Sequence, residues 1–327
     1  MKGIGKLTNE QLKQIILSGI TPLRDDVVLR PGIGVDCGAI RAGGRVCVFS
    51  TDPITAASRD AGRLAVHVSL NDVAAAGAEP VGLLLTVMAP PGTAPETLGA
   101  FVRQAQEESA KLSVEIIGGH TEFTDAVTRA VLCTTAIGIT PEDGRVFSSR
   151  GAKPGDELVL TKWAGMEGTA IIASDMPEFA AKHLTQEEIA FAQGLASQIS
   201  VVPEGRLAVK LSVTAMHDVT EGGVLGAAWE MAEASGCGVL IDTPAIPLLD
   251  VTKKLCEAGG LNPYRLISSG CMLIAAVSAK QVVKALRAKG IQAAAIGKFT
   301  ASGSVWLNDG VMKPLDPPES DELYKLI

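Results

Sequence analysis

The chain contains few aromatic residues, although it is rich in other apolar ones. Of its 327 residues only 4% are Phe, Trp or Tyr, whereas hydrophobic residues make up 47%. Surfaces that bind single-stranded nucleic acid stack bases on aromatic side chains. The net charge of −7 also opposes binding to phosphate backbones and anionic lipids. We therefore expect neither a nucleic acid nor a membrane as the main partner.

No segment has the roughly 20 consecutive apolar residues that span a bilayer. The best candidate, 64–78, is interrupted by Asn71 and Asp72, and the start of the chain (MKGIGK) has no signal-peptide core. The six cysteines include no C-x-x-C pair, which opposes a zinc site or a disulfide framework. These absences predict a cytoplasmic protein with reduced thiols.

Two common signatures of nucleotide-binding enzymes are also missing. The sequence has neither a P-loop (G-x-x-x-x-G-K-[ST]) nor the protein-kinase motifs. The pair Gly32-x-Gly34 lacks the strand–turn–helix setting of a dinucleotide fingerprint. Any ATP site must therefore be of another kind.

The pattern of apolar residues predicts two α/β domains. Segment 148–156 (SSRGAKPGD) is dense in Gly, Pro and charge, so we expect domains at 1–150 and 151–327. A capping box, Thr8 with Gln11, predicts a helix near the start. Apolar periodicity predicts first-half strands at 45–50, 81–89, 114–117 and 127–139, helices at 61–76 and 95–112, and a more regular alternation in the second half.

Four sites in the first half join small residues to a carboxylate. They are Gly34-Val35-Asp36, Ser50-Thr51-Asp52, Asn71-Asp72 and Gly118-Gly119-His120-Thr121-Glu122. The second and the fourth come just after predicted strands, where open α/β sheets commonly bind ligands.

Asp72 is the most informative of these residues because it lies inside an apolar helix. A buried carboxylate without a partner costs several kcal/mol or becomes protonated, and a metal ion would remove that conflict. Mg²⁺ prefers oxygen ligands and is usually completed by substrate phosphates. Gly118-Gly119 lets the backbone approach a phosphate closely.

A structural interpretation accounts for each motif taken singly. Asp36 and Asp52 could be turn residues, Asp72 could be capped locally, and Gly118-Gly119 could form a turn. Taken together, three aspartates and a Gly pair at element ends favour a site for Mg²⁺ and nucleotide phosphate.

In the second half, His217-Asp218-Val219-Thr220-Glu221-Gly222-Gly223 stands between a predicted strand and a predicted helix. Asp218 or Thr220 could cap this helix, or the segment could supply a ligand, and both interpretations remain open. His67 and His183 fit helical patterns, whereas His120, between Gly-Gly and Thr, has the better claim to a functional role.

In this order the motifs resemble the superfamily of aminoimidazole ribonucleotide synthase, selenophosphate synthetase, thiamine-monophosphate kinase and hydrogenase-maturation protein HypE. The resemblance covers nearly the whole chain and is most specific in Asn71–Pro80 (NDVAAAGAEP). It is closest to HypE through Gly165-Met166-Glu167-Gly168 and Asp218–Gly223. The other matching segments are Gly5-Lys6-Leu7, Gly34-x-Asp36, Ser50-Thr51-Asp52, Gly118-Gly119-x-Thr121 and Asn262–Leu266 (NPYRL).

The resemblance implies a mixed α/β (α+β), PurM-like fold. Its N-terminal half-barrel domain would bind ATP and Mg²⁺ and pair in a homodimer, and its C-terminal mixed sheet, covered by helices, would face the substrate. By position, Asp36, Asp52 and Asp72 would hold metal, and Lys6, Thr51, Asn71, Gly118, Gly119 and Thr121 would contact the nucleotide. The catalytic candidates are His120, which stands where the family usually has Asp or Glu, together with Glu122 and Asp218.

The function implied is that of an ATP-dependent phosphoryl-transfer or ligase-type enzyme that activates an amide or carboxyl-type oxygen. Its substrate would be a small molecule or protein-borne, and a maturation complex could be its partner. HypE carries its carboxamide on a C-terminal cysteine, whereas this sequence ends in LYKLI, so we expect no such reaction on its own tail. A small-molecule kinase resembling thiamine-monophosphate kinase and a non-catalytic nucleotide-binding scaffold are the alternatives.

Overall fold

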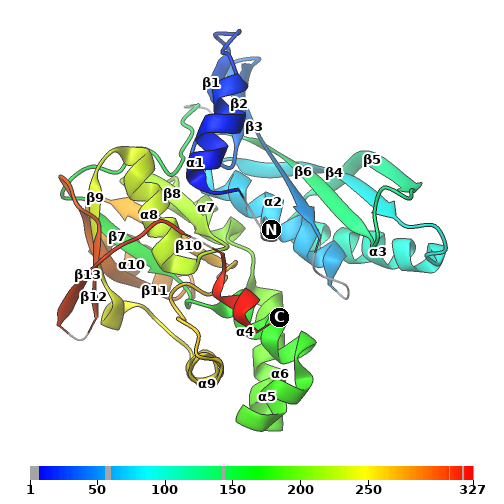
Figure 1. Ribbon diagram of the computed structural model, residues 1–327. Helices are drawn as coiled ribbons and strands as arrows, with labels where there is room; N and C mark the ends of the chain where they lie inside the picture. Colours follow the sequence, from blue (N-terminus) through cyan, green and yellow to red (C-terminus); the bar gives the residue numbers. More distant parts are fainter. Residues whose placement is uncertain (1–6, 56–59, 142–143, 309, 319, 327) are drawn as a thin grey trace. The chain divides into compact units, whose positions relative to one another are not determined.

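The computed structural model describes residues 7–55, 60–141, 144–308, 310–318 and 320–326. It divides the chain into two compact units (Figure 1). The six-stranded unit comprises Arg24–Arg30 and Asp36–Val146, and the seven-stranded unit comprises Met1–Leu23, Pro31–Val35 and Phe147–Ile327.

This division differs from a single boundary after residue 150, because two N-terminal segments belong to the seven-stranded unit. A hydrogen bond that the Ser149 hydroxyl donates to the carbonyl of Gly34 joins two of these segments. A sequence pattern records composition at the junction, whereas such a contact joins residues that are far apart in the chain.

The six-stranded sheet has the order β1-β2-β3-β6-β4-β5, and β4 and β5 form its parallel pair. Figure 1 shows α2 (Ala61–Ala75) and α3 (Pro95–Lys111) on the same side of this sheet. The strands are β1 (Val27–Leu29), β2 (Gly38–Ala42), β3 (Arg45–Ile54), β4 (Glu79–Ala89), β5 (Glu115–Phe123) and β6 (Val131–Ile139).

Strands β3 and β5 are longer than their apolar patterns predict. The ladder between β3 and β6 continues to Ile54 opposite Leu132, and the ladder between β4 and β5 continues to Phe123 opposite Ala89. Backbone pairing therefore extends through polar residues that interrupt the apolar pattern. Asp52 and the Gly118 motif lie inside strands, and the prediction that they follow strand ends is wrong.

Helix α2 is almost entirely buried, and polar groups as well as apolar ones hold it on the sheet. The hydroxyls of Ser69 and Thr134 lie 2.8 Å apart, and Thr134 donates to the carbonyl of Ala65 at 2.5 Å. A side chain at Gly138 of β6 would place its Cβ 2.3 Å from Val73, so glycine allows the close approach of helix and strand.

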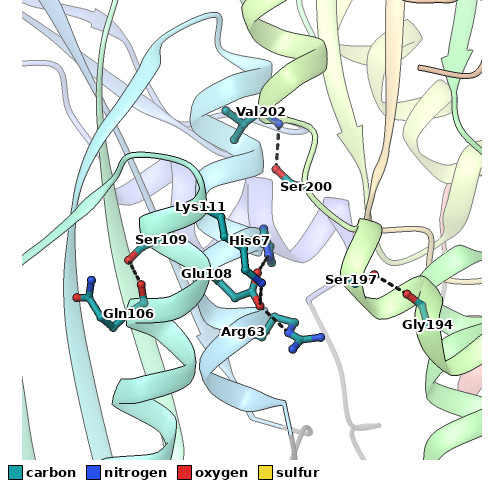
Figure 2. Close-up of polar contacts among 10 residues, drawn as sticks. All are labelled: Arg63, His67, Gln106, Glu108, Ser109, Lys111, Gly194, Ser197, Ser200 and Val202. Atoms are coloured by element: carbon teal, nitrogen blue, oxygen red, sulfur yellow. Dashed lines mark hydrogen bonds and ion pairs between the residues drawn. The ribbon is translucent and has the colours of Figure 1, made fainter. Parts of the chain in front are cut away.

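The carboxylate of Glu108 links α2 to α3 (Figure 2). It lies 3.0 Å from Arg63 Nε, 2.9 Å from Lys111 Nζ and 3.3 Å from His67 Nε2. The Glu108 side chain is only 7% exposed, and a buried charge needs such partners. His67 Nδ1 is also buried and has no hydrogen-bond partner among the described residues.

The seven-stranded sheet has the order β13-β12-β9-β11-β7-β10-β8, with β12 and β9 parallel. Every residue of β10 is buried, so the core of this unit surrounds that strand. Its strands are β7 (Glu157–Thr161), β8 (Val213–Val219), β9 (Gly238–Asp242), β10 (Cys271–Ala276), β11 (Ala293–Thr300), β12 (Val305–Asn308) and β13 (Val311–Pro314).

The helices and strands of this unit follow the predicted alternation, but helix α5 and strand β13 were not predicted. The capping box of Thr8 and Gln11 is confirmed at the start of α1 (Asn9–Gln11). Across the described ranges, no helix is both long and apolar enough to cross a bilayer. The remaining helices are α4 (Met166–Asp175), α5 (Pro177–His183), α6 (Gln186–Gly194), α7 (Val202–Ala208), α8 (Gly223–Ser235), α9 (Asp250–Gly259) and α10 (Ala279–Arg287).

The buried imidazole of His67 predicts that stability falls in mild acid. Burial lowers the pKa of His67 below its ordinary value of 6.5, because the charged ring is poorly solvated there, although Glu108 opposes this effect. Between the lowered pKa of His67 in the folded state and its ordinary pKa in the unfolded chain, the unfolded chain binds more protons than the folded one. The stability contributed by neutral His67 is therefore present above pH 6.5 and is lost as the pH falls through the folded pKa.

Urea unfolding at about pH 7.5 and about pH 5.5 tests this expectation. His67→Gln should flatten the pH dependence relative to the wild type. The control His183→Gln, at an exposed position of α5, should retain it. Equal slopes for wild type and His67→Gln would contradict the assignment.

Candidate metal site

Two of the predicted metal ligands meet at the hydroxyl of Ser50. Ser50 Oγ lies 2.5 Å from Asp72 Oδ2 and 3.3 Å from Asp52 Oδ2. Asp52 and Ser50 are on β3, whereas Asp72 is on α2 and is 6% exposed. The fold thus brings together two carboxylates that are separate in the sequence.

The donor atoms of this pair suit Mg²⁺. Both groups supply carboxylate oxygens, which this ion prefers over nitrogen or sulfur, and the side chain of Asn71 is buried next to Asp72 in the same helix. The interpretation of Asp52 as a turn residue is wrong, because it lies in a strand, and Asp72 accepts a hydrogen bond from Ser50 of another element.

Asp36 is exposed and lies two residues before β2. The ladder between β2 and β3 ends at Gly38 opposite Phe49, so Asp36 lies outside it, and its assignment as a metal ligand stays a prediction. Lys6, the other N-terminal candidate, lies outside the described residues. Its assignment to the nucleotide stays a prediction.

The Gly118–Glu122 segment lies on β5, at the edge of the sheet. Strands β6 and β4 separate it from β3, which corresponds to roughly 14 Å at about 4.8 Å per strand. A Cβ at Gly119 would lie 1.9 Å from the Leu85 carbonyl oxygen, so glycine is required by the pairing with β4. The interpretation of Gly118-Gly119 as a turn is wrong, and one copy of the sheet does not bring the pair beside Asp52.

The predicted residues also divide between the two faces of the sheet. Asp52 is paired with the buried Thr134 and faces α2, and Thr121 is in register with the buried Val87. Thr51 is on the opposite face, where it accepts a hydrogen bond from Thr135 at 3.0 Å.

His120 and Glu122 lie on that opposite face too, in register with Thr86 and Met88. Their side chains are exposed, with His120 Nε2 3.4 Å from Glu122 Oε2. Within the unit they are therefore separated by the sheet from the Asp52–Asp72 pair. Their catalytic assignment stays a prediction.

Asp218 belongs to the seven-stranded unit and is a buried residue of β8, next to His217. His217 Nε2 lies 3.1 Å from Glu230 Oε2 of α8. The expected place of Asp218 between strand and helix is wrong, because β8 pairs with β10 as far as Val219 opposite Cys271. The capping interpretation is wrong as well, since the N-cap of α8 is Gly222.

A residue 99 positions away completes the start of α8. Asp321 accepts hydrogen bonds from the backbone N–H groups of Gly222 at 2.8 Å, Ile267 at 3.2 Å and Leu323 at 2.9 Å. Pro318 packs so closely on Gly222 that a Cβ there would lie 2.9 Å from it. The glycines of this motif therefore have a packing role, which the sequence pattern alone did not separate from ligand binding.

Glu167, in the first turn of α4, is a further candidate that was not among the predicted site residues. It is buried, and its Oε2 accepts a hydrogen bond from the Ser269 N–H at 3.3 Å. Burial raises the pKa of Glu167 to about 7, and the nearby carboxylates Asp321 and Glu221 act in the same direction. Perturbed carboxyls of this kind are enriched at functional sites, and the only signal in the sequence was the Gly165–Gly168 segment.

Comparison with known proteins agrees with the family resemblance and with the predicted mixed α/β fold. Residues 34–140 match the N-terminal domain of AIR synthase related protein, and residues 153–308 match its C-terminal domain. The chain is 30% identical to a protein of Methanocaldococcus jannaschii named for hydrogenase expression and formation, over 83% of this chain and 80% of that one. It is 29% identical to the carbamoyl dehydratase HypE of Cupriavidus necator, over 85% and 80%.

Among solved structures, the fold is similar to that of hydrogenase maturation protein HypE in complex with ATP. The TM-score is 0.73 at 22% identity, and the match covers 97% of this chain and 94% of that chain. The likeness at this identity concerns the fold.

The buried carboxyl of Glu167 predicts a stability that decreases toward alkaline pH. Since its folded pKa is about 7 against an ordinary 4.5, the folded state holds the proton more tightly, and stability is lost as the pH rises between these values. Glu167→Gln should raise the free energy of unfolding at pH 8 by about 1–3 kcal/mol and leave it nearly unchanged at pH 4.5.

Denaturant unfolding at the two pH values measures this difference. Glu178→Gln, at an exposed position in α5, is the matched control and should have no pH-dependent effect. A Glu167→Gln protein that loses stability at pH 8 would show that the charged form is the one stabilised by its surroundings.

Proposed function

The chain belongs to the AIR synthase related protein family, and on this premise we propose that it is an ATP- and Mg²⁺-dependent enzyme of HypE-like type. It activates an amide or carboxyl-type oxygen by phosphorylation, and its substrate is a small molecule or a group carried by a protein. The relative named carbamoyl dehydratase and the HypE solved with ATP support this class of reaction. The use of ATP and the reduced thiols suit a cytoplasmic enzyme.

The observation that carries this proposal is the pair formed by Asp52 and Asp72 around Ser50. These two carboxylates would hold the metal together with Asp36, and Asn71, next to Asp72 in the same helix, would contact the nucleotide phosphates. A bound Mg²⁺ would neutralise the charge of a nucleotide phosphate that the carboxylates otherwise repel. The chain's own contribution is to position these oxygens on the helix-covered face of the sheet.

The chemistry proposed requires transfer of the terminal phosphoryl group of ATP. The bond between that phosphorus and the bridging oxygen of ADP breaks, and a bond forms to the oxygen of the substrate. The phosphorylated oxygen then departs as phosphate when the substrate is dehydrated or attacked. Thr51, Gly118, Gly119 and Thr121 are proposed phosphate contacts, and His120, Glu122 and Asp218 are proposed to act at the substrate.

We also propose a homodimer in which two six-stranded sheets face each other, and a maturation complex as a further partner, as the names of the relatives suggest. The face opposite α2 and α3 carries apolar side chains that are partly exposed, such as Leu84 and Ile117. Ile40 is on this face as well, in register with Cys47. Such a surface is stabilised when a second apolar surface covers it.

Loss of one carboxylate should abolish most metal-dependent nucleotide binding. Asp72→Asn keeps the shape of the side chain and one acceptor oxygen but replaces the other oxygen with an NH2 group and removes the charge. We expect the affinity for ATP in the presence of Mg²⁺ to fall at least about tenfold, which corresponds to about 1.4 kcal/mol. Calorimetric titration measures this affinity.

Asp125→Asn is the matched control, because this carboxylate is exposed on a turn of the same unit. Asp125→Asn should bind ATP as tightly as the wild type does, and EDTA should abolish ATP binding by the wild type and by this variant. Tight ATP binding that persists in EDTA would contradict the metal assignment, and binding without any turnover would favour the non-catalytic scaffold.

The proposed dimer predicts different effects for two apolar residues that are equally exposed. Leu84 on the open face of β4 and Val102 on α3 are each 39% exposed. Leu84→Glu places a charge in the proposed interface, so its mass should fall to that of a monomer at micromolar concentration. Val102→Glu should remain dimeric, and light scattering distinguishes the two. A monomeric wild type would refute the dimer.

A further inference from the structure

Ser50 lies between two carboxylates and has one hydroxyl hydrogen to share between them. Its oxygen is 2.5 Å from Asp72 Oδ2 and 3.3 Å from Asp52 Oδ2, and the residue is buried. A serine hydroxyl is one donor and also an acceptor. It therefore donates to one carboxylate at a time, and the shorter distance identifies Asp72 as the main acceptor.

The two carboxylates come from elements that other contacts hold in place. The ladder with β6 fixes β3 on both sides of Asp52, and the Ser69–Thr134 contact fixes α2 one turn before Asp72. These contacts set the backbones but not the directions of the two carboxylates. The Ser50 hydroxyl reaches both side chains, and so it can set their directions.

A hydrogen bond from Ser50 is compatible with a metal on the same carboxylate. An ionised carboxylate accepts at two oxygens with about four lone-pair positions. Groups that hydrogen-bond a ligating carboxylate orient it, and their removal typically lowers metal affinity about 10- to 100-fold. Without such a group, two like charges close together would turn away from each other.

We propose that Ser50 is a positioning residue that holds Asp52 of β3 and Asp72 of α2 in the directions from which both bind one divalent cation. The inference rests on the proposed function, since it takes these two aspartates as metal ligands. It assigns to Ser50 a role distinct from that of Thr51, whose hydroxyl is on the opposite face of the sheet and contacts Thr135.

The test compares two buried serines of the full chain. Ser50→Ala removes the hydroxyl between the carboxylates. Ser69→Ala removes an equally buried hydroxyl whose hydrogen-bond partner is Thr134. Titration with Mn²⁺ alone, followed by electron paramagnetic resonance, should show about tenfold weaker binding for Ser50→Ala. The Mn²⁺ affinity of Ser69→Ala should stay within about twofold of the wild type, because this variant loses a hydrogen bond to Thr134 and none to the two aspartates.

A second readout is the rise in melting temperature at a fixed Mn²⁺ concentration, which should be smaller for Ser50→Ala than for Ser69→Ala. Equal Mn²⁺ affinity in Ser50→Ala and the wild type overturns the positioning role. If Ser50→Ala fails to fold, Ser50→Thr keeps the hydroxyl: wild-type affinity in that variant supports the role, and a folded variant with tenfold weaker binding overturns it.

The two proposals fail in different ways. A wild type that does not bind Mn²⁺, or that binds it as well after Asp72→Asn, contradicts the metal site itself. Binding that is lost in Asp72→Asn but unchanged in Ser50→Ala leaves the metal site in place and contradicts only the role of Ser50.

Discussion

The hydrogen bond from Ser50 to Asp72 joins the six-stranded sheet to a helix that carries polar residues into the core. Helix α2 buries polar residues as well as apolar ones, among them Ser69, Asn71 and Asp72. Burying a polar side chain is unfavourable unless a partner is present. The sheet supplies such partners near Asp72. Along the inner face of β3, the apolar residues Val46 and Val48 are followed by the polar residues Ser50 and Asp52.

The same constraint explains why one strand carries both apolar and polar residues toward the same helix. The first half of β3 packs against the core, and its second half brings oxygen atoms to the same helix. β6 likewise carries a polar residue at this position: Thr134 stands opposite Asp52 and is hydrogen-bonded to Ser69. A metal site at this point uses polar residues that the fold already needs to accommodate.

The sheet also separates residues that stand close together in the sequence. Thr51 and Asp52 are adjacent but lie on opposite faces, and so do Thr121 and Glu122. The face that carries Thr51 and Glu122 is open to another surface, whereas the face of Asp52 is covered by α2. This alternation with period two is a property of every strand, and it limits which motif residues can act at one place.

In the seven-stranded unit, a distant segment replaces the local chemistry expected at a helix start. Asp321 satisfies the N–H group of Gly222, and Pro318 covers that glycine. The buried Glu167 is close enough for the charge of Asp321 to raise its pKa. The charge of both carboxylates is costly to bury, so we expect the stability of this region to depend on pH.

The sequence by itself determined most helices and most strands, the burial of Asp72, and the family, since these depend on apolar periodicity and on contiguous motifs. Only the tertiary structure decided how far β3, β5 and β8 extend, because a strand ends where its ladder with a distant strand ends. It also decided which motif residues meet. Ser50 approaches Asp72 through the packing of α2 on β3, and Asp321 reaches Gly222 from 99 residues away. Periodicity records which residues avoid water, but the partner of a buried polar group is chosen by contacts that the chain makes only when folded.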